Sequence, residues 1–289
     1  MARRFRLAVV LVAVGLAGSP GPGGSSASAA GARVSAGPAT FAADQVSVDA
    51  RGSTLIATGH VAVTYGSLRA TSDVLRLHRP TGVAVFTGHV SVADPTTKAV
   101  ADTVTLFVVH EQRVARALLA GHASVESRSY ALLADRIAAD RDAGALAADG
   151  NVTLFSQPDL IATGSRATYD ERAQHAVIFG GKSARATIQN RDGRMLGSRM
   201  DLFRGTERAV IRGPIDADVY DAKLSGADAT INLRQGVAVI TGRVTVKRRQ
   251  GTLRADRVTV FYRARRLIAE GATDLTYIDP GDAGESSAP

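Results

Sequence analysis

Apolar and polar residues alternate along most of this chain, and a glycine interrupts the alternation at nearly regular intervals. In the run from Val237 to Val246, for example, Gly242 separates two apolar stretches. Similar runs, some of them looser, centre on Gly59, Gly88, Gly121, Gly150, Gly180, Gly213 and Gly271. The successive spacings of these eight glycines are 29, 33, 29, 30, 33, 29 and 29 residues. A period of this size predicts a repeat architecture, here of eight repeats.

A second pattern lies between the glycines and begins with a small residue that an aspartate usually follows. The residues at this second position are Asp44, Asp73, Asp102, Asp135, Ser165, Ser198, Ala227 and Asp256. After each of them, apolar residues return at every second position, which predicts half-buried β-strands. Turn residues such as Asp192-Gly193 and Gln250-Gly251 separate the runs, as they do in β-hairpins.

Each repeat therefore contains two strands, and each strand has a glycine or another small residue near its middle. Glycine inside a strand marks a bulge or a sharp bend. We predict an all-β fold of about sixteen antiparallel strands that bend over into two facing sheets. Four extra residues between Val109 and Arg116 predict a longer hairpin loop in the third repeat.

The N-terminal residues 1–30 have the composition of a secretory signal peptide. Arg3, Arg4 and Arg6 precede an apolar stretch from Leu7 to Leu16, and small residues follow. The apolar stretch is about half the length that a membrane-spanning helix requires. The sequence leaves open whether this signal is cleaved or retained as an anchor in the inner membrane.

The remaining boundaries follow from composition. We interpret residues 31–40 as a linker rich in glycine, alanine and proline, and residues 279–289 as a disordered tail. Residues 41–278 form the folded part, either as one domain or as two tandem units. The formal net charge of +8 suits an anionic partner, but the excess of arginine over lysine and the abundance of alanine favour a bias of composition as its cause. Nucleic acid is disfavoured, because the chain is exported and has few aromatic side chains to stack on bases.

The sequence contains one candidate nucleotide site and one candidate metal site, and neither has the residue pattern that such a site requires. Gly181-Lys182-Ser183 resembles part of a phosphate-binding loop, but Ala176 occupies the position of that motif's first glycine. His60, His89 and His122 each follow a repeat glycine and predict a column along the sheet. Whole repeats separate them and neither acid nor cysteine accompanies them in the pattern, so we expect solvated histidines and no metal.

The recurring aspartates are equally poor candidates for catalysis. Glycan-cleaving enzymes use an isolated carboxyl pair whose members differ in pKa, whereas these aspartates recur at one repeat position. We expect them to satisfy backbone groups at the bend. The sequence thus predicts no catalytic residues, no cofactor and no enzymatic activity.

The tandem motif resembles the OstA-like periplasmic domain of lipopolysaccharide-transport proteins of the LptA type. The resemblance covers about 41–278. The residues that carry it include Ala43-Asp44-Gln45-Val46, Thr87-Gly88-His89-Val90, Asp149-Gly150-Asn151-Val152 and Ala255-Asp256-Arg257-Val258. It implies an open, twisted β-jellyroll whose apolar groove carries the acyl chains of lipopolysaccharide from the inner to the outer membrane.

The resemblance also implies partners: LptC-like inner-membrane and LptD-like outer-membrane proteins that pair with edge strands, and head-to-tail copies of the chain. Two alternatives stay open. One is a membrane-anchored, LptC-like docking component. The other is a secreted β-solenoid protein that acts on polysaccharide or serves in adhesion.

The alternation predicts which residues face the groove. The expected lipid-binding residues are Val61, Val63, Leu75, Leu77, Val90, Val92, Val104, Leu106, Val152, Leu154, Val244, Val246, Val258 and Val260. Small residues recur beside them and predict unfilled volume, namely Ala84, Ala117, Ala148, Ala176, Ala209 and Ala238.

Overall fold

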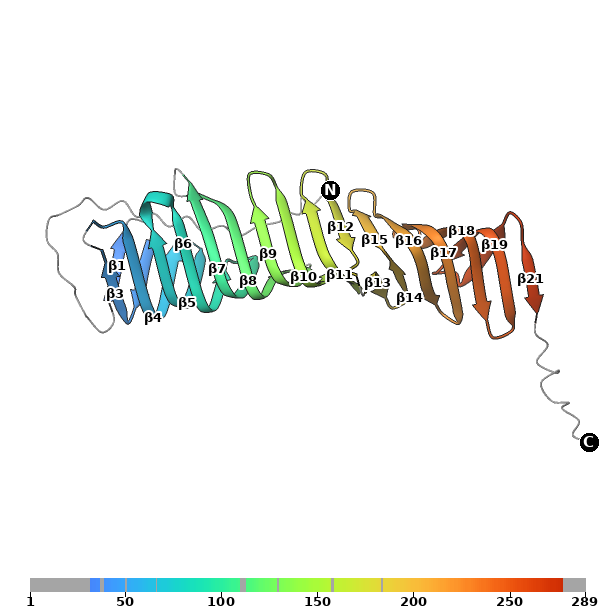
Figure 1. Cartoon of the computed structure of the whole chain (residues 1–289), viewed down its shortest axis with the longest axis horizontal. Coiled ribbons are helices and arrows are strands. Elements are labelled where there is room, and N and C mark those ends of the chain that lie inside the picture. Colours follow the sequence, from blue (N-terminus) through green and yellow to red (C-terminus); the bar gives the residue numbers. More distant parts are fainter. Residues whose placement is uncertain are drawn as a thin grey trace, which may run out of the picture. The chain divides into compact units, whose positions relative to one another are not determined.

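The structure is a computed structural model that describes residues 32–36, 39–49, 51–65, 67–109, 113–128, 130–156, 159–182 and 184–277. The predicted signal peptide (1–30) and tail (279–289) lie outside the described residues. The described part consists of antiparallel β-strands and one 3-10 turn, η1 (Arg79–Thr81) (Figure 1). No helix within it has the length and apolarity to cross a membrane. The chain divides after Leu154 into two compact units.

Unit 1 contains the first ten strands. They are β1 (Ala32–Ala36), β2 (Ala39–Ala43), β3 (Gln45–Val48), β4 (Thr54–Tyr65), β5 (Leu68–His78), β6 (Val83–Ala93), β7 (Thr97–Val109), β8 (Arg113–Ser127), β9 (Tyr130–Asp140) and β10 (Ala145–Ser156), whose last two residues belong to unit 2. From β4 to β10 each strand pairs antiparallel with the next along the chain. Short turns join them, as the turn residues predict.

Unit 2 contains the remaining strands. They are β11 (Leu160–Asp170), β12 (His175–Phe179), β13 (Ala186–Asn190), β14 (Gly193–Gly197), β15 (Arg199–Phe203), β16 (Arg208–Val219), β17 (Ala222–Asn232), β18 (Val237–Arg248), β19 (Gly251–Phe261), β20 (Arg266–Glu270) and β21 (Asp274–Tyr277). From β16 to β19 the pairing again follows chain order.

In four places two short strands pair with the two halves of one long strand. These are β2 and β3 on β4, β12 and β13 on β11, β14 and β15 on β16, and β20 and β21 on β19. When each such pair is counted once, the 21 strands become sixteen long strands and the short β1. The prediction of an all-β fold with about sixteen antiparallel strands is confirmed.

The pairing of neighbouring long strands is interrupted near their middles by a bulge at the repeat glycine, which every second long strand carries. Between β4 and β5 the register shifts between Thr58 and Val61, so that Gly59 and His60 together face Asp73. Similar shifts interrupt the pairings β5–β6, β6–β7, β7–β8, β8–β9, β16–β17, β17–β18 and β18–β19. A bulge bends the strand that carries it, so a column of bulges bends the whole sheet.

The core lies between the two halves of the bent strands. Along β5 the side chains of Leu68, Ala70 and Ser72 are buried, and those of Leu75 and Leu77 are buried after a one-residue shift of the alternation at the bend. A sheet that buries one face needs a second layer to cover it. The described residues contain no helical layer, so the two halves of each strand cover one another. The facing layers are therefore halves of the same strands, in agreement with the prediction of strands that bend over into two facing layers.

Two local predictions were wrong. Residues 31–40 were expected to be a linker, but β1 and the first residues of β2 lie there and pair with each other from Ala32 with Ala43 to Ala36 with Ala39. Backbone hydrogen bonds form this pairing, so it needs no apolar pattern.

The extra residues of the third repeat lengthen strands more than they lengthen a loop. Val109 ends β7 and Arg113 begins β8, while Val108 pairs with Val114 and Phe107 with Arg116. A second bulge at Ala115 absorbs one of the added residues. The hairpin is longer, but most of the added length is paired.

The burial pattern predicts the effect of one charge on the two faces of β18. Val244 is completely buried, whereas Thr245 is half-buried on the outer face and pairs with Arg254. We expect Val244→Asp to lower the free energy of unfolding by roughly 3–5 kcal/mol, because it leaves an unpaired charge in the core. Thr245→Asp should change it by about 0.5 kcal/mol or less. Denaturant unfolding of both variants checks the register, and equal losses would contradict it.

Candidate functional site

The candidate site is the buried inner face of the bent sheet. Of the fourteen residues predicted to bind lipid, thirteen are at most 6% exposed. Leu154 is the exception and is half-buried at the end of unit 1. Unit 1 holds ten of the fourteen and unit 2 holds Val244, Val246, Val258 and Val260. The alternation thus predicted the inner face correctly, whereas lipid contact at these residues stays a prediction.

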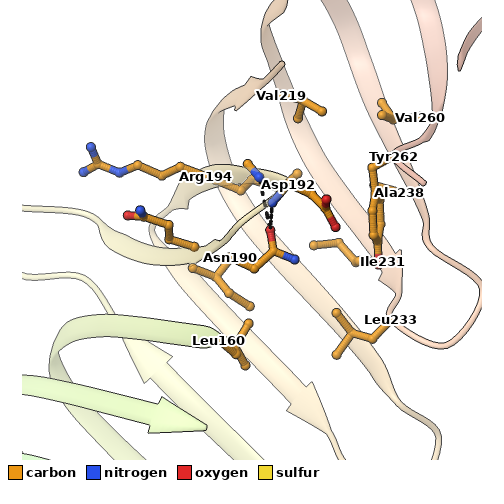
Figure 2. A pocket seen from close by; sticks show the side chains of 14 residues that line it. Leu160, Asn190, Asp192, Arg194, Val219, Ile231, Leu233, Ala238, Val260 and Tyr262 are labelled. Carbon is orange, nitrogen blue, oxygen red and sulfur yellow. Dashed lines mark hydrogen bonds between the residues drawn. The ribbon is translucent and has the colours of Figure 1, made fainter. Parts of the chain in front are cut away.

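The interior is filled by its own side chains except for small hollows. One cavity in unit 2 has a volume of about 60 Å³, enough for a few water molecules but far less than an acyl chain. Its lining includes the apolar residues Ile188, Met195, Ile231, Ala238 and Val260. Figure 2 shows the β13–β14 turn on one side of this cavity. Strands β17, β18 and β19 lie on the other side.

Polar groups lie at the rim of the cavity. The side-chain oxygen of Asn190 accepts hydrogen bonds from the backbone N–H groups of Asp192 and Gly193, at 3.0 and 3.1 Å (Figure 2). Tyr262 stands opposite, and burial raises the pKa of its hydroxyl. An apolar floor with a polar rim is the environment that an amphiphilic molecule requires.

The predicted small residues lie in this interior. Ala84, Ala117, Ala148, Ala209 and Ala238 are at most 4% exposed, and Ala176 is half-buried. They alternate with larger neighbours across the sheet; Leu106, for example, pairs with Ala84 on one side and with Ala117 on the other. Ala238 lines the cavity, which agrees with the expectation that alanine leaves volume unfilled.

The outer side of the bend carries a row of aspartate–histidine pairs, which we call the spine. His60, His89 and His122 each place Nδ1 2.9–3.0 Å from the carboxylate of Asp44, Asp73 and Asp102, respectively. The histidine side chains are 92–93% exposed. They are solvated, as predicted, but the expectation that no acid accompanies them was wrong.

The same geometry explains the repeat glycine. Gly88 has φ +79°, which favours glycine, and a Cβ placed there would lie 2.2 Å from a carboxylate oxygen of Asp73. His89, the next residue, also has a positive φ of 47°, and this orientation presents its ring to the aspartate. Neighbouring strands supply the two partners, so the side chains connect strands at the bend.

Other repeats satisfy the same position differently. Asn151 donates from its side-chain amide to Asp135 at 3.1 and 3.2 Å. Asp256 accepts a hydrogen bond from the backbone N–H of Ala272 at 3.0 Å, and Ser165 donates to the carbonyl oxygen of Gly180 at 2.9 Å. The aspartates were expected to satisfy backbone groups, and among these contacts only that of Asp256 is of that kind.

The spine affects protonation but offers no metal site. The hydrogen bond to Asp44 and the charge of that residue raise the pKa of His60 above its ordinary value, and Asp73 does the same for His89. Within the described residues no group of three or more histidine, aspartate or glutamate side chains is close enough to hold a metal ion.

A buried carboxylate on the outer face of unit 2 was not recognised from the sequence. Asp201 has a side chain only 2% exposed, and it accepts hydrogen bonds from Arg199 at 2.6 and 2.9 Å and contacts His175 Nε2 at 3.0 Å. Burial opposes ionisation, but these partners outweigh it and hold the pKa of Asp201 below its ordinary value. The cluster joins β12 to β15 and has no nucleophile among its contacts, so we interpret it as structural.

The rejected phosphate-loop candidate has no loop-to-helix geometry. Gly181 and Lys182 lie between β12 and β13, and strand β13 follows instead of a helix. The prediction that this motif binds no nucleotide is consistent with the strand that follows it.

Bent antiparallel strands around an apolar interior define an all-β class of protein in which one long sheet folds over on itself. The family model of "LptA/(LptD N-terminal domain) LPS transport protein" matches residues 40–208 and 223–286. The chain belongs to this family. It is a family of non-enzymatic transport proteins, which confirms the recognised resemblance and the absence of enzymatic function and sets aside the polysaccharide-acting alternative.

Among solved structures, the chain is similar to LptH of Pseudomonas aeruginosa, described as the LptA homologous periplasmic component of the lipopolysaccharide transport device. The match has 18% identity and a TM-score of 0.38, and it covers 42% of this chain and 93% of LptH. A search of curated protein sequences found no significant match.

The spine predicts a pH-dependent contribution to stability. His60 and His89 have a raised pKa in the folded chain, so their stabilising effect is complete below the unfolded value of about 6.5 and is lost as the pH rises through the folded value. We expect the melting temperature of the parent, relative to that of a His60→Asn/His89→Asn variant, to decrease as the pH is raised from about 5.5 to about 8.5.

Asparagine is the matched replacement, because Asn151 already pairs with Asp135 at the equivalent position. Asparagine also tolerates the positive φ of the site. A parent-to-variant difference that is the same at both pH values would show that these pairs contribute nothing linked to protonation.

Proposed function

We propose that the chain is a periplasmic carrier that holds the acyl chains of lipopolysaccharide against the inner face of the bent sheet. The observation that carries this proposal is the row of buried aliphatic side chains that follows the alternation through the repeats within each unit. Membership of a lipopolysaccharide transport family supports the choice of ligand. The periplasmic location of LptH and the predicted signal at 1–30 support the compartment.

The energetics of acyl chains explain the need for such a carrier. Each methylene buried from water contributes about 0.8 kcal/mol, so exposing a twelve-carbon chain costs roughly 10 kcal/mol. A lipid with several chains cannot cross an aqueous compartment unprotected. A continuous apolar surface lets the lipid move by exchanging one buried contact for another at nearly constant free energy. The chain supplies the path, and its partners supply the direction.

Loading requires the two halves of the sheet to separate. Side chains such as Val90 in unit 1 and Ile211 and Ile240 in unit 2 are fully buried in this structure, so an acyl chain must replace packing contacts that each of them now makes. Aliphatic contacts are non-directional, and acyl chains can replace them without leaving polar groups unpaired. The described residues contain no buried side-chain nitrogen or oxygen without a hydrogen-bond partner.

The ends of the sheet are suited to pairing with other strands. β1 pairs with β2, and β3 pairs with β4, so β1 and β3 form the first edge of the sheet. At the other end β20 and β21 both pair with β19. Such edges are templates for an added strand. We infer docking to LptC-like and LptD-like proteins, or to further copies of the chain, through these edges.

Photo-crosslinking tests the ligand and the face. Val92 lies between Ala70 and Ala99, and Leu106 lies between Ala84 and Ala117 in the sheet, so the neighbouring alanines leave room for a photoreactive side chain. A photoreactive residue at either position should capture lipopolysaccharide in cells. The matched outer-face positions, Ser91 and Thr105, should capture severalfold less, because their side chains point away from the interior. Equal capture from both faces, or none from either, would contradict the proposal.

Proline tests docking at the C-terminal edge. Ile268→Pro in β20 or Leu275→Pro in β21 removes a backbone donor from an edge strand, where proline is tolerated. We expect affinity for the outer-membrane or inner-membrane partner to fall roughly fivefold or more, while the melting temperature changes little. Circular dichroism identifies the variants that remain folded. Unchanged partner binding by folded variants would exclude docking through this edge.

A further inference from the structure

In unit 2, hairpin turns from the two opposite ends of the bent strands meet. We call this region the mouth. Tyr220 lies in the turn between β16 and β17, whereas Tyr262 and Arg265 lie in the turn between β19 and β20. The hydroxyl of Tyr220 donates a hydrogen bond to the carbonyl oxygen of Tyr262. The guanidinium carbon of Arg265 lies 4.9 Å from the centre of the Tyr220 ring. Both contacts close the side of the sheet that lies opposite the bend.

The backbone of Tyr220 is unusual for a bulky side chain. Its φ of 54° is in the left-handed region, which large residues adopt rarely and at a cost in free energy. The side chain is nevertheless 44% exposed, so burial of the ring is not what holds it there. The contacts with Tyr262 and Arg265 explain the position of the ring, and the ring in turn positions a guanidinium at the mouth.

Three arginines surround a small hollow at this mouth. Arg248 of β18, Arg265 and Arg266 line it together with the apolar residues Val219, Ala222, Val260 and Leu267. Ala222 and Val260 are buried and belong to the inner face of the sheet. The hollow therefore joins the apolar interior to a cationic rim.

The rim has more positive charge than its neighbours neutralise. Arg248 lies 3.9 Å from Asp221, at the limit of an ion pair. Arg265 stacks on Tyr220, and Arg266 lies over Phe261 at 5.8 Å. Within residues 184–277, the part of the chain described around the mouth, neither of these two arginines has an ion pair with a carboxylate. An anion bound at the hollow that both residues line would balance their positive charge.

We propose that Arg248, Arg265 and Arg266 bind the phosphate groups of a phosphorylated lipid head group at the mouth of unit 2. Guanidinium groups offer planar pairs of N–H donors that match phosphate oxygens. The apolar floor beneath receives the first methylenes of the acyl chains. This inference rests on the proposed function and adds to it the orientation of the lipid, with acyl chains inward and phosphates at this rim.

Binding of diphosphoryl lipid A and of dephosphorylated lipid A in detergent micelles to the full chain tests the site. In an Arg248→Gln/Arg265→Gln/Arg266→Gln variant we expect the affinity for the diphosphoryl form to fall about tenfold, because three charge-assisted contacts are removed. Affinity for the dephosphorylated form should stay unchanged. A matched control is Arg76→Gln/Arg254→Gln/Arg257→Gln, which removes the same charge from exposed outer-face positions and should bind both forms as the parent does.

The outcomes separate the site from the carrier function. One outcome is that the parent binds both forms of lipid A while the rim variant keeps its affinity for both, or loses affinity for both equally. Either result would contradict the proposed phosphate site and leave the carrier function standing. If the parent binds neither form, the carrier function and the site both fail. Excess inorganic phosphate should compete weakly, since it cannot use the apolar floor. Complete displacement of lipid A by inorganic phosphate would indicate a site for a free anion and would overturn the lipid assignment. Unchanged melting temperatures confirm that the exposed substitutions leave the fold intact.

Discussion

The bend in the middle of each strand is the constraint on which the rest of the structure depends. A chain built from amphipathic strands must cover one face of its sheet, and here the sheet folds over and covers itself. The bulge makes this possible because a residue such as Gly59 adopts a positive φ where Asp44 leaves no space for a Cβ. In unit 2, Gly213 and Gly242 keep the positive φ although Ser198 and Ala227 replace the acid. The glycine therefore permits the bend, and the aspartate adds a contact between strands.

Most of the fold could be predicted from the sequence because its determinants are local and repeated. Alternation alone assigned Val90 and Val92 to the interior, and the glycine period located the bends. Interactions between strands on the outer face could not be predicted this way. The pairing of His60 with Asp44 depends on a left-handed histidine backbone, and Asp201 is buried by side chains of β12 and β15 that alternation assigns to solvent. The strand β1 was missed because Ala32 to Ala36 pair through their backbone in a segment whose composition suggests a linker.

The candidate site shares this division. The two-residue alternation of apolar and polar positions determines the inward-facing residues. The tightness of their packing depends on the angle between the two halves of the bent sheet. In this structure Leu75 and Leu106 are almost completely buried, so the groove is an adaptable apolar core more than a preformed channel. Such a core suits a ligand made of flexible methylene chains, because aliphatic side chains can exchange partners without breaking hydrogen bonds. Alanines such as Ala84 and Ala238 reduce the contact that must be given up.

The two sides of the bent sheet differ in a way that determines how an amphiphile can lie in it. At the spine each exposed histidine has an aspartate within hydrogen-bonding distance, so the row consists of complementary polar pairs. At the mouth of unit 2, Arg265 and Arg266 stand next to the inner-face residues Val260 and Ala222. An amphiphile needs an apolar and an ionic environment in direct contact, because its acyl chains and its phosphates are covalently joined. Within the described residues, the bulges close the interior at the spine, whereas the turns of the mouth place arginines next to inner-face side chains, so the mouth of unit 2 meets this requirement.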